Sequence, residues 1–152
     1  MPTRKPQEGK KKVDGKARSI KQLKADLWRL FSKFIRERDK YTCYTCGKPG
    51  NEAGHFYHSK GYLIHFEERA VHTQCPQCNR WKSGNLQEYA RRLVRDYGPG
   101  ILDEFNDLKN IAYKPTRQEY EKRIEHYKAA LSNQLEKPTY DDLDKVLKEC
   151  GL

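Results

Sequence analysis

The residues best suited to chemistry are four cysteines arranged as two CxxC pairs. Cys43 and Cys46 form the first pair, Cys75 and Cys78 the second, and 28 residues separate the pairs. Each pair can hold two thiolates about 2.3 Å from a shared ion, so the four cysteines predict a tetrahedral Zn²⁺ site with no open position, which is therefore structural. Buried unligated thiols or a redox pair, which would need a βαβ context, are less favoured alternatives. Cys150 is isolated and receives no role.

The segment between the cysteine pairs carries four of the five histidines, His55, His58, His65 and His72, and Asn79 directly follows the second pair. A histidine at the end of a short strand, followed by a second strand and a helix bearing asparagine, suits phosphodiester hydrolysis. The imidazole can deprotonate a water near neutral pH, and a divalent ion held by the helix can stabilise the phosphate charge. For His65 we prefer an ordinary structural role. His58 and His72 could ligate metal, contact phosphate or pack.

Helical patterns flank this region on its N-terminal side. Ser19 and Gln22 form a capping box, and apolar residues then recur at helical spacing, which predicts an amphipathic N-terminal helix over residues 19–39. Residues 40–98, the predicted core, are rich in Tyr, His, Cys and Gly. Within them we predict a strand near 53–57, a loop around 58–65, a strand near 69–74, a helix from about Pro76 and a helix over Asn85–Tyr97.

The remaining residues, 99–152, are predicted to form a C-terminal helical region. Helices are expected over 101–108 and 116–136, where Thr116 and Glu119 form a second capping box, and a last short helix after Thr139. The fold class expected from these patterns is α+β, mostly helical, with N- and C-terminal helices flanking a small zinc-stapled core.

Charge and hydropathy limit the possible partners. The chain has 31 Lys and Arg against 21 Asp and Glu, a net charge of +10, so polyanions are the expected partners. Residues 1–18 are predicted to be a flexible basic arm, either a solubilising tail or a grip on DNA phosphates through Lys10, Lys11 and Lys12. The sequence contains no apolar stretch long enough to predict a membrane span or a secretory signal, so we expect a cytoplasmic location.

Three short runs form a specific combination: Ala53-Gly-His55, His72-Thr-Gln-Cys-Pro-Gln-Cys-Asn79 and Lys82-Ser-Gly-Asn85. This combination resembles the NinG/Rap family of lambdoid-phage recombination endonucleases, over about residues 41–98. The resemblance implies a ββα-metal (HNH-like, His-Me finger) core. It also implies a metal-dependent endonuclease that hydrolyses branched recombination intermediates, such as Holliday junctions and D-loops, in the host cytoplasm.

The resemblance implies roles for single residues. His55 matches the general base, and Asn79 matches the last position of the pattern, which helps bind the catalytic Mg²⁺ or Mn²⁺. Gly54 stands where a metal-binding Asp often precedes the base, and Ala70 stands where an Asn usually orients it. Glu52 is the nearest acid, but strand alternation places it opposite His55, so we expect it to reach the ion only with an irregular backbone. The candidate ligands for the catalytic ion are Asn79, His72, Glu52 and His58.

Residues just after the second cysteine pair are candidates for DNA contact. Arg80, Lys82 and Asn85 would bind phosphates without reading sequence. Trp81 could stack on an unpaired base or fill the core, and we favour the core.

Two further questions stay open at the level of sequence. A two-fold symmetric junction favours a homodimer, and the N- and C-terminal helices could form its interface or only pack on the core. The alternative function is a non-catalytic, zinc-containing nucleic-acid-binding or adaptor protein. Gly54 and Ala70 favour that alternative, whereas His55 followed by Asn79 favours the endonuclease.

Overall fold

The computed structural model describes residues 16–58 and 61–135. Three predictions fall outside these residues: most of the basic arm, including Lys10, Lys11 and Lys12, the short helix after Thr139, and the surroundings of Cys150.

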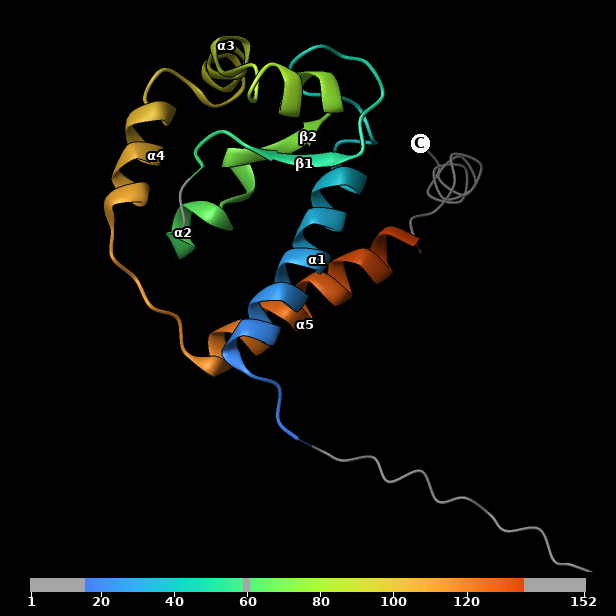
Figure 1. Cartoon of the computed structure of the whole chain (residues 1–152), viewed down its shortest axis with the longest axis vertical. Coiled ribbons are helices and arrows are strands. Elements are labelled where there is room, and N and C mark those ends of the chain that lie inside the picture. The colour runs from blue at the N-terminus through green and yellow to red at the C-terminus, as the bar shows by residue number, and fades with distance from the viewer. Residues whose placement is uncertain (1–15, 59–60, 136–152) are drawn as a thin grey trace, which may run out of the picture.

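The described part of the chain is a mostly helical α+β structure, as predicted, with one small sheet. Helices α1 and α5 pack together on one side of the two-stranded hairpin, and α3 lies on the other side (Figure 1). In chain order the elements are α1 (Ile20–Arg38), β1 (Glu52–His55), α2 (Tyr62–His65), η1 (Glu68–Ala70), β2 (Val71–Gln74), η2 (Gln77–Trp81), α3 (Leu86–Tyr97), α4 (Ile101–Asn110) and α5 (Arg117–Leu135).

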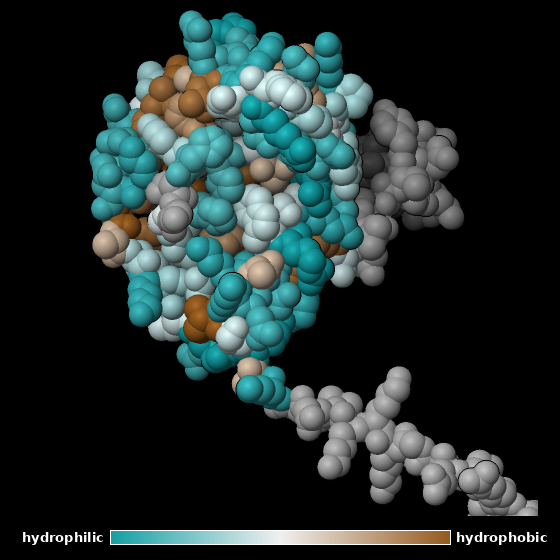
Figure 2. Space-filling view, in the orientation of Figure 1, coloured by the Kyte–Doolittle hydropathy of each residue, from teal (hydrophilic) through white to brown (hydrophobic). Residues whose placement is uncertain are grey.

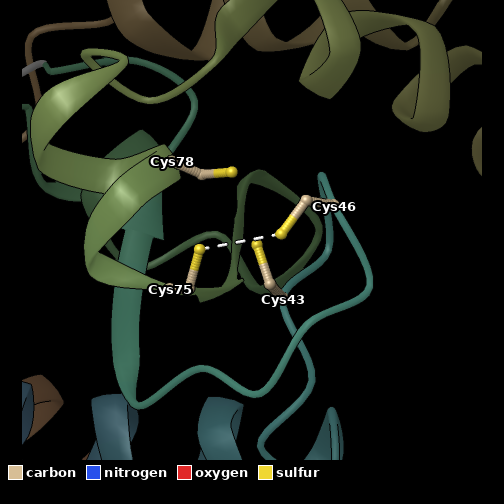
Figure 3. Close-up of side chains that lie close together, drawn as sticks. All are labelled: Cys43, Cys46, Cys75 and Cys78. Carbon is tan, nitrogen blue, oxygen red and sulfur yellow. Dashed lines mark hydrogen bonds between the residues drawn. The ribbon is translucent and has the colours of Figure 1, made fainter.

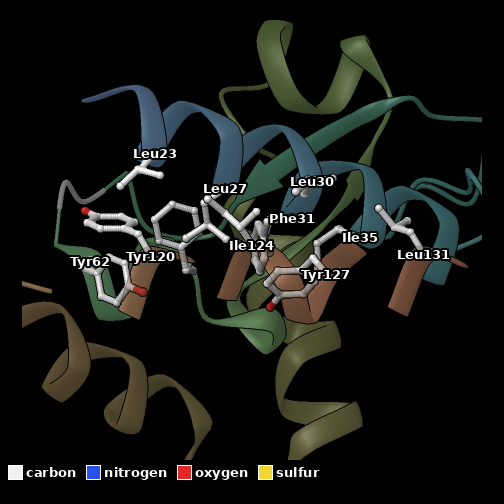
Figure 4. Packing of buried hydrophobic residues seen from close by; sticks show 12 residues of the cluster. Leu23, Leu27, Leu30, Phe31, Ile35, Tyr62, Tyr120, Ile124, Tyr127 and Leu131 are labelled. Atoms are coloured by element: carbon white, nitrogen blue, oxygen red, sulfur yellow. The ribbon is translucent and has the colours of Figure 1, made fainter. Parts of the chain in front are cut away.

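Helix α1 begins at the predicted capping box. The Gln22 backbone N–H donates to the Ser19 hydroxyl at 3.2 Å, and the Ser19 N–H donates to the Gln22 side chain at 2.7 Å. The apolar face of α1 packs against α5 and the hairpin (Figure 4), with the Phe31 and Tyr127 rings edge to face at 5.4 Å. The sequence left open whether this helix forms a dimer interface or packs on the core of its own chain. The structure shows that its apolar face packs within the chain.

The hairpin is antiparallel, with Glu52 opposite Gln74 and Gly54 opposite His72. Opposed residues share a face, and successive residues alternate between faces. The face toward α1 carries Ala53, His55, Val71 and Thr73, and the other face carries Glu52, Gly54, His72 and Gln74. This division decides which candidate site residues can meet.

One local prediction was wrong: the expected loop around 58–65 contains helix α2, because Tyr62 and Ile64 are buried in the core. The helix predicted from about Pro76 is present as the short element η2, a single π-type turn. It ends because Ser83, Gly84 and Asn85 follow with φ of 49°, 91° and 49°, a left-handed backbone that no α-helix can continue.

The surface contrasts with this buried core. The face seen in Figure 2 is largely hydrophilic, and its hydrophobic patches are small and separate. Among the described residues, no helix is both long enough and apolar enough to cross a membrane.

The packing of α1 predicts a large effect at Leu27, which is 0% exposed. Leu27→Ala should lower the free energy of unfolding by about 2–5 kcal/mol, because a cavity adds to the lost apolar burial. Urea denaturation of zinc-loaded protein measures this change. Lys33→Ala, at an exposed position of the same helix, should stay within about 0.5 kcal/mol. Equal effects of the two substitutions would contradict the α1–α5 packing.

Candidate metal centre and active site

The four predicted cysteines converge from three segments of the chain (Figure 3). Cys43 and Cys46 lie in a tight turn, Cys75 directly follows β2, and Cys78 lies in η2. Their sulfur atoms all lie within 4.8 Å of one another, and the Cys46 and Cys75 sulfurs are 3.7 Å apart. A tetrahedron with Zn–S bonds of 2.3 Å has edges of about 3.8 Å. The four cysteines therefore fit a zinc ion, and none of them is in a disulfide.

Neighbouring polar groups prepare these sulfurs for a cation. Burial raises the pKa of the Cys43 thiol, but the Thr45 hydroxyl and nearby backbone N–H groups outweigh it and lower the pKa. Burial and the surrounding thiols raise the pKa of Cys46. The Asn85 side-chain amide lies 3.7 Å from the Cys78 sulfur. One thiolate is thus favoured by the protein alone, and a dication supplies the charge that stabilises the others.

A carboxylate and an amide meet on the hairpin face away from α1. The Asn79 side-chain N–H donates to Glu52 Oε2 at 2.8 Å, and Arg80 forms an ion pair with the other carboxylate oxygen. Glu52 lies on the strand face opposite His55, as strand alternation predicted, and contacts Asn79 there. Since η2 lies over the face that Glu52 and Gly54 share, a regular strand brings Glu52 and Asn79 together.

Gly54 lies beside these groups, and a residue with a side chain does not fit at this position. A Cβ at this position would lie 2.1 Å from the Gln74 side-chain oxygen and 3.1 Å from the Asn79 side-chain oxygen. The first distance is far below van der Waals contact. A side chain at position 54 therefore has no room here, because the Gln74 amide occupies that space.

His55 lies on the opposite face, against α1. Its ring stacks on Trp28 at 4.9 Å and on His65 at 4.4 Å, and its Nε2 lies 3.0 Å from the His65 carbonyl oxygen. A carbonyl only accepts, so Nε2 carries the proton and Nδ1 keeps its lone pair. Burial lowers the pKa of His55, and the neighbouring His58 adds to this effect against the His65 carbonyl. The lowered pKa favours the neutral imidazole, in which Nδ1 is the nitrogen that can accept a proton.

Trp28 is the site residue that sequence reasoning missed. Trp28 and the His65 carbonyl oxygen together hold the His55 ring. Trp28 is half-buried at the edge of the apolar stripe of α1. Its position next to Leu27 carried no signal that distinguished it from an ordinary core residue.

His72, a further candidate metal ligand, shares a hairpin face with Glu52, but its ring nitrogens have other partners. His72 is buried, stacks on Tyr44 at 3.8 Å, and has its ring nitrogens 3.0 Å from an Arg38 nitrogen and 3.1 Å from the Arg69 carbonyl oxygen. Both nitrogens are occupied, so His72 has a structural role. His58 is exposed after the end of β1.

The candidate DNA contacts differ in exposure. Arg80 and Lys82 are exposed, and Trp81 is 80% exposed, so the preference for Trp81 in the core was wrong. It lies at the end of η2, which is too short to reach the core. The half-buried Asn85 is turned inward to Cys78.

Fold and site define a mostly helical α+β protein with a small hairpin joined to a tetracysteine metal centre. A family model described as "Bacteriophage Lambda NinG protein" matches residues 2–137. The chain belongs to the NinG family of phage proteins, which confirms that part of the predicted resemblance. The endonuclease activity implied by the resemblance stays a prediction.

Relatives named "Protein ninG" occur in several phages. The protein of Escherichia phage lambda is 38% identical over 82 residues, 51% of this chain and 40% of the relative. The protein of Salmonella phage P22 is 34% identical over 102 residues, 60% of this chain and 50% of the relative. The chain thus spans about half the length, or less, of these relatives. No solved structure is detectably similar to it.

The tetracysteine geometry predicts one zinc ion per chain, measured by elemental analysis. Cys75→Ser should reduce the zinc content and unfold residues around the hairpin, because structural zinc contributes directly to folding free energy. Chelation of the wild type should have the same effect on its circular dichroism. Cys150→Ser is the matched control and should retain full zinc. Equal zinc content in both variants would contradict the site.

Proposed function

We propose that this chain is a metal-dependent endonuclease that hydrolyses phosphodiesters in branched DNA of the host cytoplasm, such as Holliday junctions and D-loops. One observation carries the proposal: the Glu52 carboxylate contacts the Asn79 amide on one face of the hairpin, and His55, three residues after Glu52, presents a ring nitrogen that can accept a proton. A simple zinc adaptor needs the cysteines but has no use for this arrangement.

His55 acts as the general base in this mechanism. Its Nδ1 takes the proton of the attacking water, while the Nε2 proton stays hydrogen-bonded to the His65 carbonyl. Trp28 keeps the ring in the plane that this hydrogen bond requires. The lowered pKa keeps the imidazole neutral at physiological pH, so the base is ready before substrate binds.

Glu52 and Asn79 fit a hard divalent cation, because carboxylate and amide oxygens are the donors that Mg²⁺ and Mn²⁺ prefer. Such an ion would stabilise the charge on the phosphate and on the leaving 3′ oxygen. The base and the oxygen cluster lie on opposite faces of β1 but close along it. The proposal therefore requires a phosphodiester to lie across β1, within reach of both.

DNA contacts come from the exposed end of η2. Arg80 and Lys82 provide salt-dependent phosphate binding without sequence recognition. Trp81, between them and exposed to solvent, offers a ring on which an unpaired base at a branch point can stack. Two chains on a two-fold symmetric junction would supply its two cuts.

His55→Ala should lower the cleavage rate of a labelled four-way junction by about 10²- to 10⁴-fold, the usual contribution of a general base. The assay uses zinc-loaded protein with Mg²⁺ or Mn²⁺, with EDTA as a blank and a matched linear duplex as the substrate control. Junction binding by the variant should persist, since His55 faces α1 and not the basic end of η2.

His126→Ala, at an exposed histidine of α5, is the matched control and should cleave like the wild type. Wild-type protein that binds the junction without cleaving it under either metal would rule out the endonuclease. That outcome would establish the nucleic-acid-binding adaptor instead.

Trp81→Ala should weaken binding to the four-way junction by about 5-fold or more, because base stacking on an aromatic contributes roughly 1–3 kcal/mol. Binding to linear duplex should change little, since its bases are already stacked. Fluorescence anisotropy with both DNAs measures the difference. Tyr113→Ala, at an exposed aromatic far along the chain, should affect neither. Equal losses on both DNAs would refute a branch-specific stacking contact.

A further inference from the structure

Gln74, the last residue of β2, is fully buried with a fixed side-chain orientation. Its Nε2 donates to the Gly84 carbonyl oxygen at 2.8 Å and to the Thr45 hydroxyl at 3.2 Å. A carbonyl oxygen can only accept a hydrogen bond, so the amide nitrogen must lie on that side. The amide oxygen Oε1 therefore points the other way.

That oxygen has no hydrogen-bond partner in the part of the chain that the structure describes, although it is buried. An unpaired buried acceptor costs about 1–3 kcal/mol. Native proteins satisfy nearly all such groups, and those without a protein partner are usually paired with an ordered water or an ion. The buried oxygen thus indicates a ligand that is not part of the protein.

The position of Oε1 indicates which ligand this is. Both Gln74 Oε1 and Asn79 Oδ1 border the point where a Cβ of residue 54 would lie, at 2.1 Å and 3.1 Å. The Asn79 amide in turn touches Glu52. Two side-chain amide oxygens therefore meet beside Gly54, and the Glu52 carboxylate lies on the nitrogen side of the Asn79 amide. Amide oxygens of this kind are suitable ligands for a hard divalent cation, and Mg²⁺ binds oxygen at 2.0–2.1 Å.

We propose that Gln74 Oε1 is a ligand of the catalytic divalent cation, together with Glu52 and Asn79. The inference rests on the cation site of the proposed function and adds a third ligand to it. Gln74 supplies the oxygen that Gly54 does not, and a side chain at residue 54 would displace it. Gly54 leaves the space that the Gln74 side chain needs in order to place its oxygen at the site.

Mn²⁺ binding to the zinc-loaded full chain tests this directly, by the electron paramagnetic resonance signal of free Mn²⁺. Gln74→Met keeps the side-chain volume but removes the oxygen, and should weaken Mn²⁺ binding at least about tenfold. Gly54→Ala should weaken it too, because the new Cβ displaces Oε1. The swap variant Gly54→Asp/Gln74→Ala should recover wild-type affinity or better, because the carboxylate then occupies the place of the amide oxygen.

Thr73→Val is the matched control at a buried β2 position on the other face, and should bind Mn²⁺ like the wild type. Zinc content and circular dichroism verify that each variant is folded. If Gln74→Met loses zinc, the Mn²⁺ affinities of Gly54→Ala and of the swap variant test the role of Gln74 instead. Wild-type affinity in Gln74→Met, or a folded swap variant that does not recover binding, would overturn the role of Gln74. If Glu52→Gln alone loses Mn²⁺, the proposed function survives without Gln74. If the zinc-loaded wild type binds no Mn²⁺, both fail.

Discussion

The structure depends on the cross-link that the two cysteine pairs could make by holding one metal ion. The hairpin has only four residues in each strand, and a two-stranded hairpin of this size is at best marginally stable by itself. The four sulfurs join the turn at Cys43–Cys46 to the end of β2 and to η2. Because Asn79 directly follows Cys78, the same cross-link fixes the side-chain amide over the hairpin. The candidate structural metal site and the Glu52–Asn79 pair thus have ligands at adjacent positions, Cys78 and Asn79.

The hairpin divides the candidate site between its two faces. Toward α1, aromatic stacking and one carbonyl hold His55 in a partly dry environment that favours the neutral imidazole. On the other face, carboxylate and amide oxygens gather around Gly54 under η2. A general base must be neutral, which a partly buried environment favours, whereas a cation site needs oxygen donors. The two faces of one strand provide these different environments.

The sequence predicts what depends on neighbours along the chain. The CxxC pairs, the capping boxes at Ser19 and Thr116, and the alternation of Glu52 and His55 all have short-range causes, and the structure shows each of them. Which face of the hairpin η2 covers is a tertiary fact, so Glu52 and Asn79 could not be paired in advance. The stack of Trp28 on His55 and the exposure of Trp81 likewise depend on contacts between distant segments, for which single residues carry no signal.

The pairing of α1 with α5 has a consequence for synthesis of the chain. Helix α1 ends at Arg38, and its partner is complete only at Leu135. At about 5–20 residues per second, the ribosome needs roughly 5–20 s to produce the intervening chain. The leucines and Phe31 of α1 lack their α5 partners during this interval, while the tetracysteine segment is finished earlier. The nascent protein therefore spends seconds with a complete tetracysteine segment and an uncovered apolar helix, the state in which association with chaperones or with other chains is most favourable.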